Sequence, residues 1–178
     1  EKDWNLLRHI KWMRRAAEQG AHVVAFPECS LTGYGGMAET AIAVDDEAIS
    51  QIIRLAGDLG LQALVGLGER DRDLVYSSCI LLGEGGVTGV MRKINCIPEE
   101  SKIYASGHEF PVFEVAGRRL GVAICADASV YEVPKILALR GAEIVFCPHA
   151  NGHPGFRGSP IRWRRWRLSC WRRFAPDC

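Results

Sequence analysis

The sequence has no long apolar run, no closely spaced cysteine pair and no excess of charge of either sign. No stretch approaches the roughly 18 apolar residues of a membrane-spanning helix, so we expect no membrane partner. The chain opens with Glu1-Lys2-Asp3 and passes directly into a helical pattern, so we expect no signal peptide. The formal net charge of +1 gives no reason to expect nucleic acid as a partner.

The seven cysteines are odd in number and form no C-x-x-C pair, which fits neither a disulfide framework nor a zinc ribbon. Reduced thiols in a cytoplasmic protein are the simpler interpretation. Cys147 and His149 lack a second pair of ligands, so we expect no metal site and no cofactor. Most cysteines are expected to be small buried apolar side chains.

Hydrophobic residues make up 48% of the 178 residues, which suits one domain with a packed core. Hydrophobic spacing predicts helices at 4–17, 45–56 and 132–140, the first with Trp4, Leu7, Ile10 and Met13 on its apolar face. Strands are expected at 22–26, 63–67, 74–82, 87–94, 111–115, 118–125 and 143–147. Helices alternate with strands at both ends and hairpins lie between them, which predicts an α/β layered fold with a mixed sheet.

Three reactive side chains, Glu28, Lys93 and Cys125, lie at or just beyond the ends of predicted strands. In open α/β sheets, ligands bind beyond the carboxyl ends of the strands. Glu28 can take the thiol proton of Cys125 and later activate water. Lys93 can stabilise an oxyanion, helped by the backbone N–H of Ala126, and its charge should favour the thiolate.

Each of these residues also has an ordinary structural interpretation. A cysteine at a strand end is more often a packing residue, and a single lysine is usually a solvated surface charge. Glu28, after Phe26-Pro27, could equally cap a loop. Position alone therefore leaves catalysis and packing both open.

Three segments resemble motifs of the nitrilase (carbon–nitrogen hydrolase) superfamily. They are Ala25-Phe26-Pro27-Glu28-Cys29-Ser30-Leu31-Thr32-Gly33-Tyr34, Met91-Arg92-Lys93-Ile94-Asn95-Cys96-Ile97-Pro98-Glu99-Glu100, and Gly121-Val122-Ala123-Ile124-Cys125-Ala126-Asp127 with Glu132. They resemble F-P-E-x-x-x-x-G-Y, Y-R-K-x-H-L-x-P-x-E and G-x-x-I-C-Y-D-x-x-F-P-E in the family's order, over about residues 3–150. The resemblance implies an αββα sandwich and a Glu-Lys-Cys triad formed by Glu28, Lys93 and Cys125.

The family often has a further acidic residue in the loop after the lysine, and the resemblance places it at Glu99 or Glu100, of which we favour Glu100. Loop solvation is the alternative for both. Tyr34 is expected to shape the substrate pocket, together with Glu100 and Ala126. Met91 replaces the usual tyrosine, Asn95-Cys96 replaces His-Leu, and Ala126 replaces a common aromatic residue, which leaves the substrate class open.

Compared with the family pattern, the chain lacks the usual first strand and departs after Phe156, so we expect a domain truncated at both ends. We assign residues 1–156 to a partial carbon–nitrogen hydrolase domain and 157–178 to an Arg/Trp-rich tail foreign to the fold. A shifted reading frame is the favoured origin of the tail. A cationic helix face, or a segment that binds nucleic acid or a membrane surface, are the alternatives.

The resemblance implies a hydrolase of a small amide, carbamoyl or nitrile substrate, acting through a cysteine thioester. A non-catalytic or vestigial fragment is the second hypothesis, because part of the family's chain is missing. An acyltransferase that passes the acyl group to an amine through the same triad is the third. Family members commonly associate, so a homo-oligomer is also expected.

Overall fold

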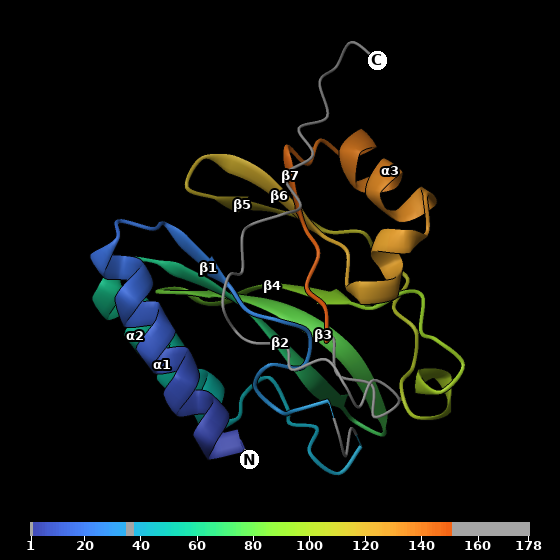
Figure 1. The fold of residues 1–178 in the computed structure, drawn as a ribbon, viewed down its shortest axis with the longest axis horizontal. Coiled ribbons are helices and arrows are strands. Elements are labelled where there is room, and N and C mark those ends of the chain that lie inside the picture. The colour runs from blue at the N-terminus through green and yellow to red at the C-terminus, as the bar shows by residue number, and fades with distance from the viewer. Residues whose placement is uncertain (1, 35–37, 151–178) are drawn as a thin grey trace, which may run out of the picture.

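The computed structural model describes residues 2–34 and 38–150 of the chain (Figure 1). Its elements are α1 (Lys2–Glu18), β1 (Val23–Ala25), α2 (Glu47–Leu59), β2 (Gln62–Asp71), β3 (Leu74–Gly83), β4 (Gly86–Arg92), the 3-10 helix η1 (Glu100–Lys102), β5 (Val112–Val115), β6 (Arg118–Val122), the 3-10 helix η2 (Cys125–Ser129), α3 (Glu132–Leu139) and β7 (Ile144–Phe146). The Arg/Trp-rich segment 157–178 and the domain boundary at 156 lie outside the described residues.

The strands form two sheets. In the first, the order is β1-β2-β3-β4, with β1 parallel to β2 and the other neighbours antiparallel. In the second, the order is β5-β6-β7, with β5 antiparallel and β7 parallel to β6. The two hairpins expected from the sequence, β3-β4 and β5-β6, are both present, and the mixture of strand directions agrees with the predicted mixed sheet.

Four layers result, in the order helices, sheet, sheet, helix (Figure 1). Alternate residues of β2 and β3 point to opposite faces, and both faces are buried. One set, including Val65 and Ile80, packs with α1 and α2, and the other, including Leu64 and Leu81, packs against the second sheet. Val133 and Leu137 of α3 cover the outer face of that second sheet. The predicted αββα sandwich is therefore confirmed.

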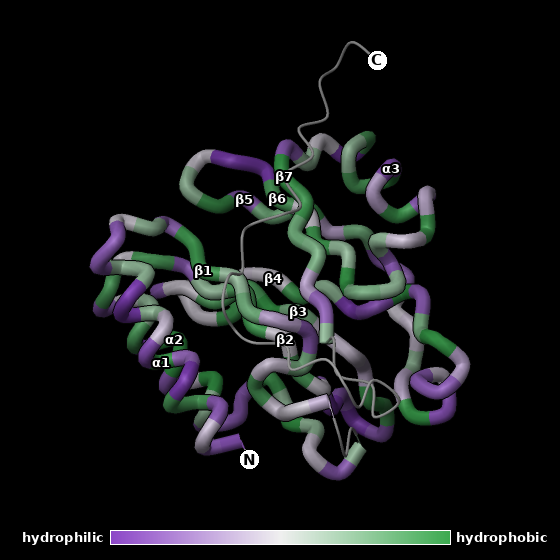
Figure 2. Tube along the Cα trace, in the orientation of Figure 1, coloured by the Kyte–Doolittle hydropathy of each residue, from purple (hydrophilic) through white to green (hydrophobic). Residues whose placement is uncertain are grey.

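The buried face of α1 agrees with the expected one only in the second half of the helix, where Met13 is buried and Ile10 packs against the core. Trp4 and Leu7 are 65% and 60% exposed, whereas Leu6, His9 and Met13 are buried. Both sets repeat at helical spacing, but only the second continues through Ala16 and Ala17 to the end of the helix. In Figure 2 hydrophilic residues recur along α1, while β7 is hydrophobic throughout.

His9 can occupy the core because both of its ring nitrogens have partners. Nδ1 lies 2.7 Å from the carbonyl oxygen of Asn5, and Nε2 lies 3.0 Å from Ser30 Oγ. Burial lowers the pKa of His9 to about 4, so the ring is neutral at physiological pH.

None of the helices in residues 2–34 and 38–150 has the length and apolar character needed to cross a bilayer.

Candidate active site

The three predicted residues follow strands of the two facing sheets. Glu28 lies in the turn after β1, and Lys93 follows β4 and extends its pairing through a backbone N–H bond to Ser77 O at 2.8 Å. We expected the strand before Cys125 to include that cysteine, but β6 ends at Val122 and Cys125 begins η2. The backbone N–H of Cys125 donates to Pro148 O at 2.8 Å, just after β7. The segment that follows β7, which runs parallel to the one that follows β6, therefore still fixes the position of Cys125.

Glu28 and Lys93 form a buried ion pair. Lys93 Nζ lies 2.8 Å from Glu28 Oε1, and the two side chains are 0% and 1% exposed. Ser77 Oγ also donates to Oε1, at 3.2 Å, and the backbone N–H of Ala150 donates to Oε2, at 3.0 Å. Donors from three separate segments therefore hold this one carboxylate in place.

Lys93 has a second carboxylate partner in Glu100. Its Nζ lies 2.8 Å from both Oε1 and Oε2 of Glu100, which is fully buried. Tyr34 OH donates to Oε1 at 2.7 Å and the N–H of Ile97 donates to Oε2 at 3.0 Å. Glu99 is exposed, so Glu100 is the glutamate of this loop that meets the lysine.

The charges in this cluster support one another. Burial disfavours the ammonium, but hydrogen bonds and charges of Glu100 and Glu28 outweigh that effect and raise the pKa of Lys93. Burial likewise disfavours the Glu100 carboxylate, yet hydrogen bonds from Lys93 and Tyr34 lower its pKa below the ordinary value. Burial and the bond to Glu100 raise the pKa of Tyr34, which therefore stays a neutral donor.

Cys125 is a protonated thiol at neutral pH. Burial is the largest cause that raises its pKa, to about 11, and the negative charge of Glu28 is the second. Lys93 lowers the pKa of Cys125, the direction expected from the sequence, but burial and the charge of Glu28 outweigh it. A hydrogen bond with Glu28 also contributes, which identifies the carboxylate as the group beside the thiol.

The backbone of Cys125 is left-handed, with φ of 49°. Non-glycine residues rarely adopt this conformation, and it is found at functional turns when the surroundings impose it. Here a strand leads into a 3-10 helix, and the sharp turn sets the thiol at the start of η2. Ala126 follows in the first turn of η2, where backbone N–H groups have no acceptor within the helix.

A second cysteine next to the site has a different character. Cys29 is 1% exposed, and its Sγ lies 3.7 Å from Tyr104 OH and 3.9 Å from Ser77 Oγ. Burial, followed by the charge of Glu28, raises its pKa to about 12. Cys29 is therefore a packing residue rather than a nucleophile.

Three contributors to the site were missed by sequence reasoning. Ser77 interrupts an apolar strand, which was a usable signal, because a buried hydroxyl needs a partner. Ala150 contributes only a backbone N–H and leaves no trace in the sequence. Asp127 was part of a quoted motif without a role, and in the structure it accepts hydrogen bonds from Ile94, Asn95 and Ile124.

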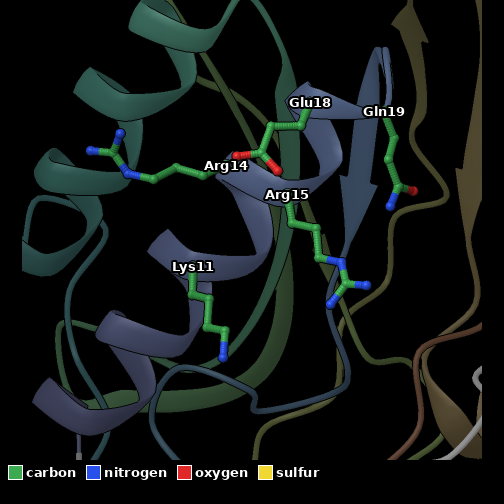
Figure 3. A pocket seen from close by; sticks show the side chains of 5 residues that line it. All are labelled: Lys11, Arg14, Arg15, Glu18 and Gln19. Atoms are coloured by element: carbon green, nitrogen blue, oxygen red, sulfur yellow. The ribbon is translucent and has the colours of Figure 1, made fainter.

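A surface hollow lies elsewhere, along α1, and is lined by Lys11, Arg14, Arg15, Glu18 and Gln19 (Figure 3). Arg14 and Arg15 extend in different directions from the helix, so their charges do not converge on one point. None of these residues belongs to the buried cluster. Within residues 2–34 and 38–150, no group of three His, Cys, Asp or Glu side chains is arranged to hold a metal ion.

Comparison with known proteins identifies the class that this fold and this site define. Residues 1–168 match the model of the carbon-nitrogen hydrolase family, and the chain belongs to that family. It is 32% identical over 170 residues to a nitrilase of Pyrococcus abyssi. The matched region covers 91% of this chain and 65% of the nitrilase. It is 30% identical to human omega-amidase NIT2, covering 84% of this chain and 59% of the relative.

Solved structures give the same result. A mutant of the Nesterenkonia AN1 amidase, a member of the nitrilase superfamily, superposes with a TM-score of 0.76 at 26% identity, over 87% of this chain and 62% of the amidase. A glutamine-dependent NAD+ synthetase of Acinetobacter baumannii, at 24% identity and a TM-score of 0.70, shares the fold. The chain thus spans about three fifths of the length of the nitrilase, omega-amidase and amidase relatives.

Proposed function

We propose that the chain hydrolyses the carbon–nitrogen bond of a small amide through a thioester on Cys125. The observation that carries the proposal is the buried pair of Glu28 Oε1 and Lys93 Nζ, 2.8 Å apart, beside the Cys125 thiol. This arrangement offers a base, a cation and a nucleophile in one place. Carbamoyl and nitrile substrates are the alternatives within the same chemistry.

In the first half-reaction, Cys125 Sγ attacks the amide carbon while its proton passes to Glu28. The raised pKa of the thiol suits this order, because proton transfer accompanies attack instead of preceding it. The negative charge that develops on the amide oxygen is stabilised by Lys93 Nζ and the backbone N–H of Ala126. The C–N bond then breaks, Glu28 returns the proton to the leaving nitrogen, and ammonia departs from the thioester.

In the second half-reaction, Glu28 takes a proton from water as the water oxygen attacks the thioester carbon. The tetrahedral intermediate collapses by breaking the C–S bond, and the sulfur regains its proton from Glu28. The carboxylic acid is released and the thiol is restored. Water is the only reactant besides the amide, and Glu28 ends as the carboxylate with which it began.

We propose that Glu100 and Tyr34 position other groups of the site and take no part in the making and breaking of bonds. Both oxygens of Glu100 already accept hydrogen bonds from protein groups, so we propose that it holds Lys93 and borders the substrate only through that lysine. Tyr34 is half-buried and bonded to Glu100, and we propose that its ring forms part of the pocket wall. Ala126, small where the family often has an aromatic residue, leaves room for the substrate beside Cys125.

The preference for an amide comes from the relatives. One solved structure of the Nesterenkonia amidase carries acrylamide joined by Michael addition at the active-site cysteine, and another contains butyramide. We propose the same substrate class here, a short neutral amide. We also propose a cytoplasmic setting, because the nucleophile needs a reduced thiol.

The test is ammonia release from butyramide by the purified chain, compared with Cys125→Ala and with Cys147→Ala, whose cysteine is also partly exposed. We expect release from the native chain and from Cys147→Ala only. Incubation with acrylamide should add one acrylamide mass to the peptide that contains Cys125. No release and no adduct would favour the vestigial alternative, and release only with an added amine acceptor would favour the acyltransferase.

A further inference from the structure

Asp127 is a fully buried carboxylate held by four N–H donors. Its Oδ1 accepts from the backbone N–H of Asn95 at 2.7 Å and from Asn95 Nδ2 at 2.9 Å. Its Oδ2 accepts from the backbone N–H groups of Ile94 and Ile124, each at 3.3 Å. Burying a carboxylate is costly unless such donors satisfy it, so this set of bonds is specific and not incidental.

The four donors come from two segments that carry the proposed catalytic groups. Ile94 and Asn95 directly follow Lys93, and Ile124 directly precedes Cys125. One side chain therefore joins the backbone beside the lysine, on the first sheet, to the backbone beside the nucleophile, on the second. The Cys125 turn, with φ of 49°, is a conformation that needs such support.

We propose that Asp127, with Asn95 as its amide partner, is a positioning residue that sets Lys93 against Cys125. The proposal rests on the proposed function, because the relation that Asp127 fixes is that between the oxyanion-stabilising cation and the nucleophile. A displacement of about 1 Å between reacting groups can cost on the order of 10²-fold in rate. Substrate binding depends on other contacts, so the effect should fall on kcat and leave KM nearly unchanged.

The donor from Asn95 is a side-chain amide, which does not titrate, so the donor side of the Asp127–Asn95 bond brings no pH dependence. The thiol of Cys96 interacts electrostatically with Asp127, and also with Lys93 and Glu100. Burial raises the pKa of Cys96, with Ser106 and Lys93 opposing and Glu100 and Asp127 adding to the rise. A histidine at position 95, as in the family motif, would make this connection dependent on pH.

The experiment compares Asp127→Asn with Asp73→Asn, an exposed aspartate in the β2-β3 turn. An asparagine side chain has only one acceptor oxygen, so it can satisfy one of the two donor pairs. We expect Asp127→Asn to lower kcat for butyramide about 10²-fold with KM within about twofold. Asp73→Asn should match the native chain in both constants.

Asn95→His and Asn95→Ala provide the readouts that a purely structural role would not change. Asn95→His should add an ionisation near pH 6 to 7 to the kcat profile, because the imidazole titrates there. Asn95→Ala removes one of the four donors and should lower kcat less than Asp127→Asn does, while its melting temperature stays near native. The Ala variant also keeps the question testable should Asp127→Asn fail to fold.

Rates are expressed per folded chain, with the folded fraction taken from thermal melting followed by circular dichroism, so unfolded protein does not count. Unchanged kcat per folded chain in Asp127→Asn and Asn95→Ala, or an unaltered pH profile in Asn95→His, would overturn the positioning role. The second-order rate of Cys125 labelling is measured in parallel and needs no substrate. If the native chain releases no ammonia, the proposed function fails. Slower Cys125 labelling in Asp127→Asn, but not in Asp73→Asn, would then still support the positioning role, and equal labelling would overturn it.

Discussion

The ammonium of Lys93 is shared by two buried carboxylates, those of Glu28 and Glu100. The Lys93 ammonium therefore contributes to stability as well as to the proposed catalysis. A buried charge that loses its partner is far more costly than a surface charge, because neither water nor a counter-ion replaces the lost contact. At this position stability and reactivity depend on the same atom.

We expect Lys93→Met to lower the free energy of unfolding by about 3–5 kcal/mol, because two buried carboxylates lose their cation. Urea denaturation followed by tryptophan fluorescence measures the change. Lys102→Met, at an exposed lysine of η1, is the matched control and should remain within about 0.5 kcal/mol of native. Equal stability of the two variants would show that the buried pair contributes no net stabilisation.

The same ion pairs fix the pH dependence of stability. The folded pKa of Lys93 is raised above its ordinary 10.5, so its contribution is complete below that value and is lost as pH rises through the folded pKa. The folded pKa of Glu100 is lowered from 4.5, so its contribution is complete above that value and is lost as pH falls through the folded pKa. Between about pH 4.5 and 10.5 we expect the contribution of these two groups to the stability of the native chain, measured by urea denaturation, not to vary with pH.

Glu28→Gln should preserve the shape of the site and remove its base. We expect kcat for butyramide to fall by about 10²–10⁴-fold, the usual contribution of a general base. Thermal melting should show a folded protein, because Lys93 keeps Glu100 as its partner. Glu99→Gln, at the exposed glutamate beside Glu100, is the control. Its kcat should equal that of the native chain, and a loss as large as that of Glu28→Gln would contradict the assignment.

Alkylation should separate Cys125 from the buried thiols. Its pKa of about 11 makes the thiolate scarce at neutral pH, so labelling by iodoacetamide should rise roughly tenfold per pH unit between pH 7 and 10. Cys29 and Cys79, with pKa values of about 12 and almost no exposure, should label much more slowly. Peptide mapping measures all three, and equal rates in the folded chain would contradict a distinct nucleophile.

At the scale of elements, close contact between β2 and the Glu28 turn sets the position of Glu28, the proposed base. A Cβ atom on Gly66 would collide with Pro27 O and would lie 2.9 Å from Glu28 Cα. We expect Gly66→Ala to lower the free energy of unfolding by about 1–3 kcal/mol through overpacking, and to lower kcat as well. Gly85→Ala is the control, because only Thr88 lies within 4.0 Å of its Cβ. Native kcat in Gly66→Ala would show that the turn tolerates displacement.

The sequence predicted the elements better than their exact ends and faces. Strong apolar runs and Gly-rich turns located β2, β3 and β4, and the position of Lys93 after β4 followed directly. The buried face of α1 could not be read in the same way, since Trp4 and Leu7 repeat at the same spacing as the buried set. Nor could the end of β6, because Ala123 and Ile124 stay buried after the strand pairing stops.

Contacts formed through backbone groups or across the two sheets lay beyond sequence reasoning. The bonds of Asp127 join residues 94–95 to residue 124 only once the sheets are stacked. The family resemblance favoured Glu100 over Glu99, but the physical reason lies in the turn into η1, which buries Glu100 and exposes Glu99. Side-chain identity suggested the chemistry of the site, and tertiary packing decided which residues are within bonding distance.

At the scale of the whole molecule, the edge strands β1 and β7 are the places where we expect another copy to pair. In the part of the chain that the structure describes, β1 pairs with β2 alone and β7 with β6 alone, and both strands consist only of Val, Ala, Ile and Phe. Neither has the charge or proline that usually protects an exposed edge. The second sheet therefore offers an apolar template for another strand at β7, and the first sheet does so at β1.

We expect the purified chain to associate in a concentration-dependent manner, because short apolar edges pair with other copies. Gel filtration over a range of loading concentrations measures the association. Val145→Lys in β7 should shift the profile toward the monomer, whereas Val87→Lys, in edge strand β4, should not. A native chain that elutes as a monomer at every concentration would contradict this expectation.

The hydrogen bond from Ala150 N to Glu28 Oε2 joins positions 122 residues apart. During synthesis Glu28 leaves the ribosome long before Ala150, and at 5–20 residues per second the interval is roughly 6–24 seconds. Throughout that time β1 and the first sheet can form, but the base lacks one of its donors and Cys125 lacks its partner at Pro148. The full set of contacts around Glu28 and Cys125 can therefore form only after residue 150 has been synthesised.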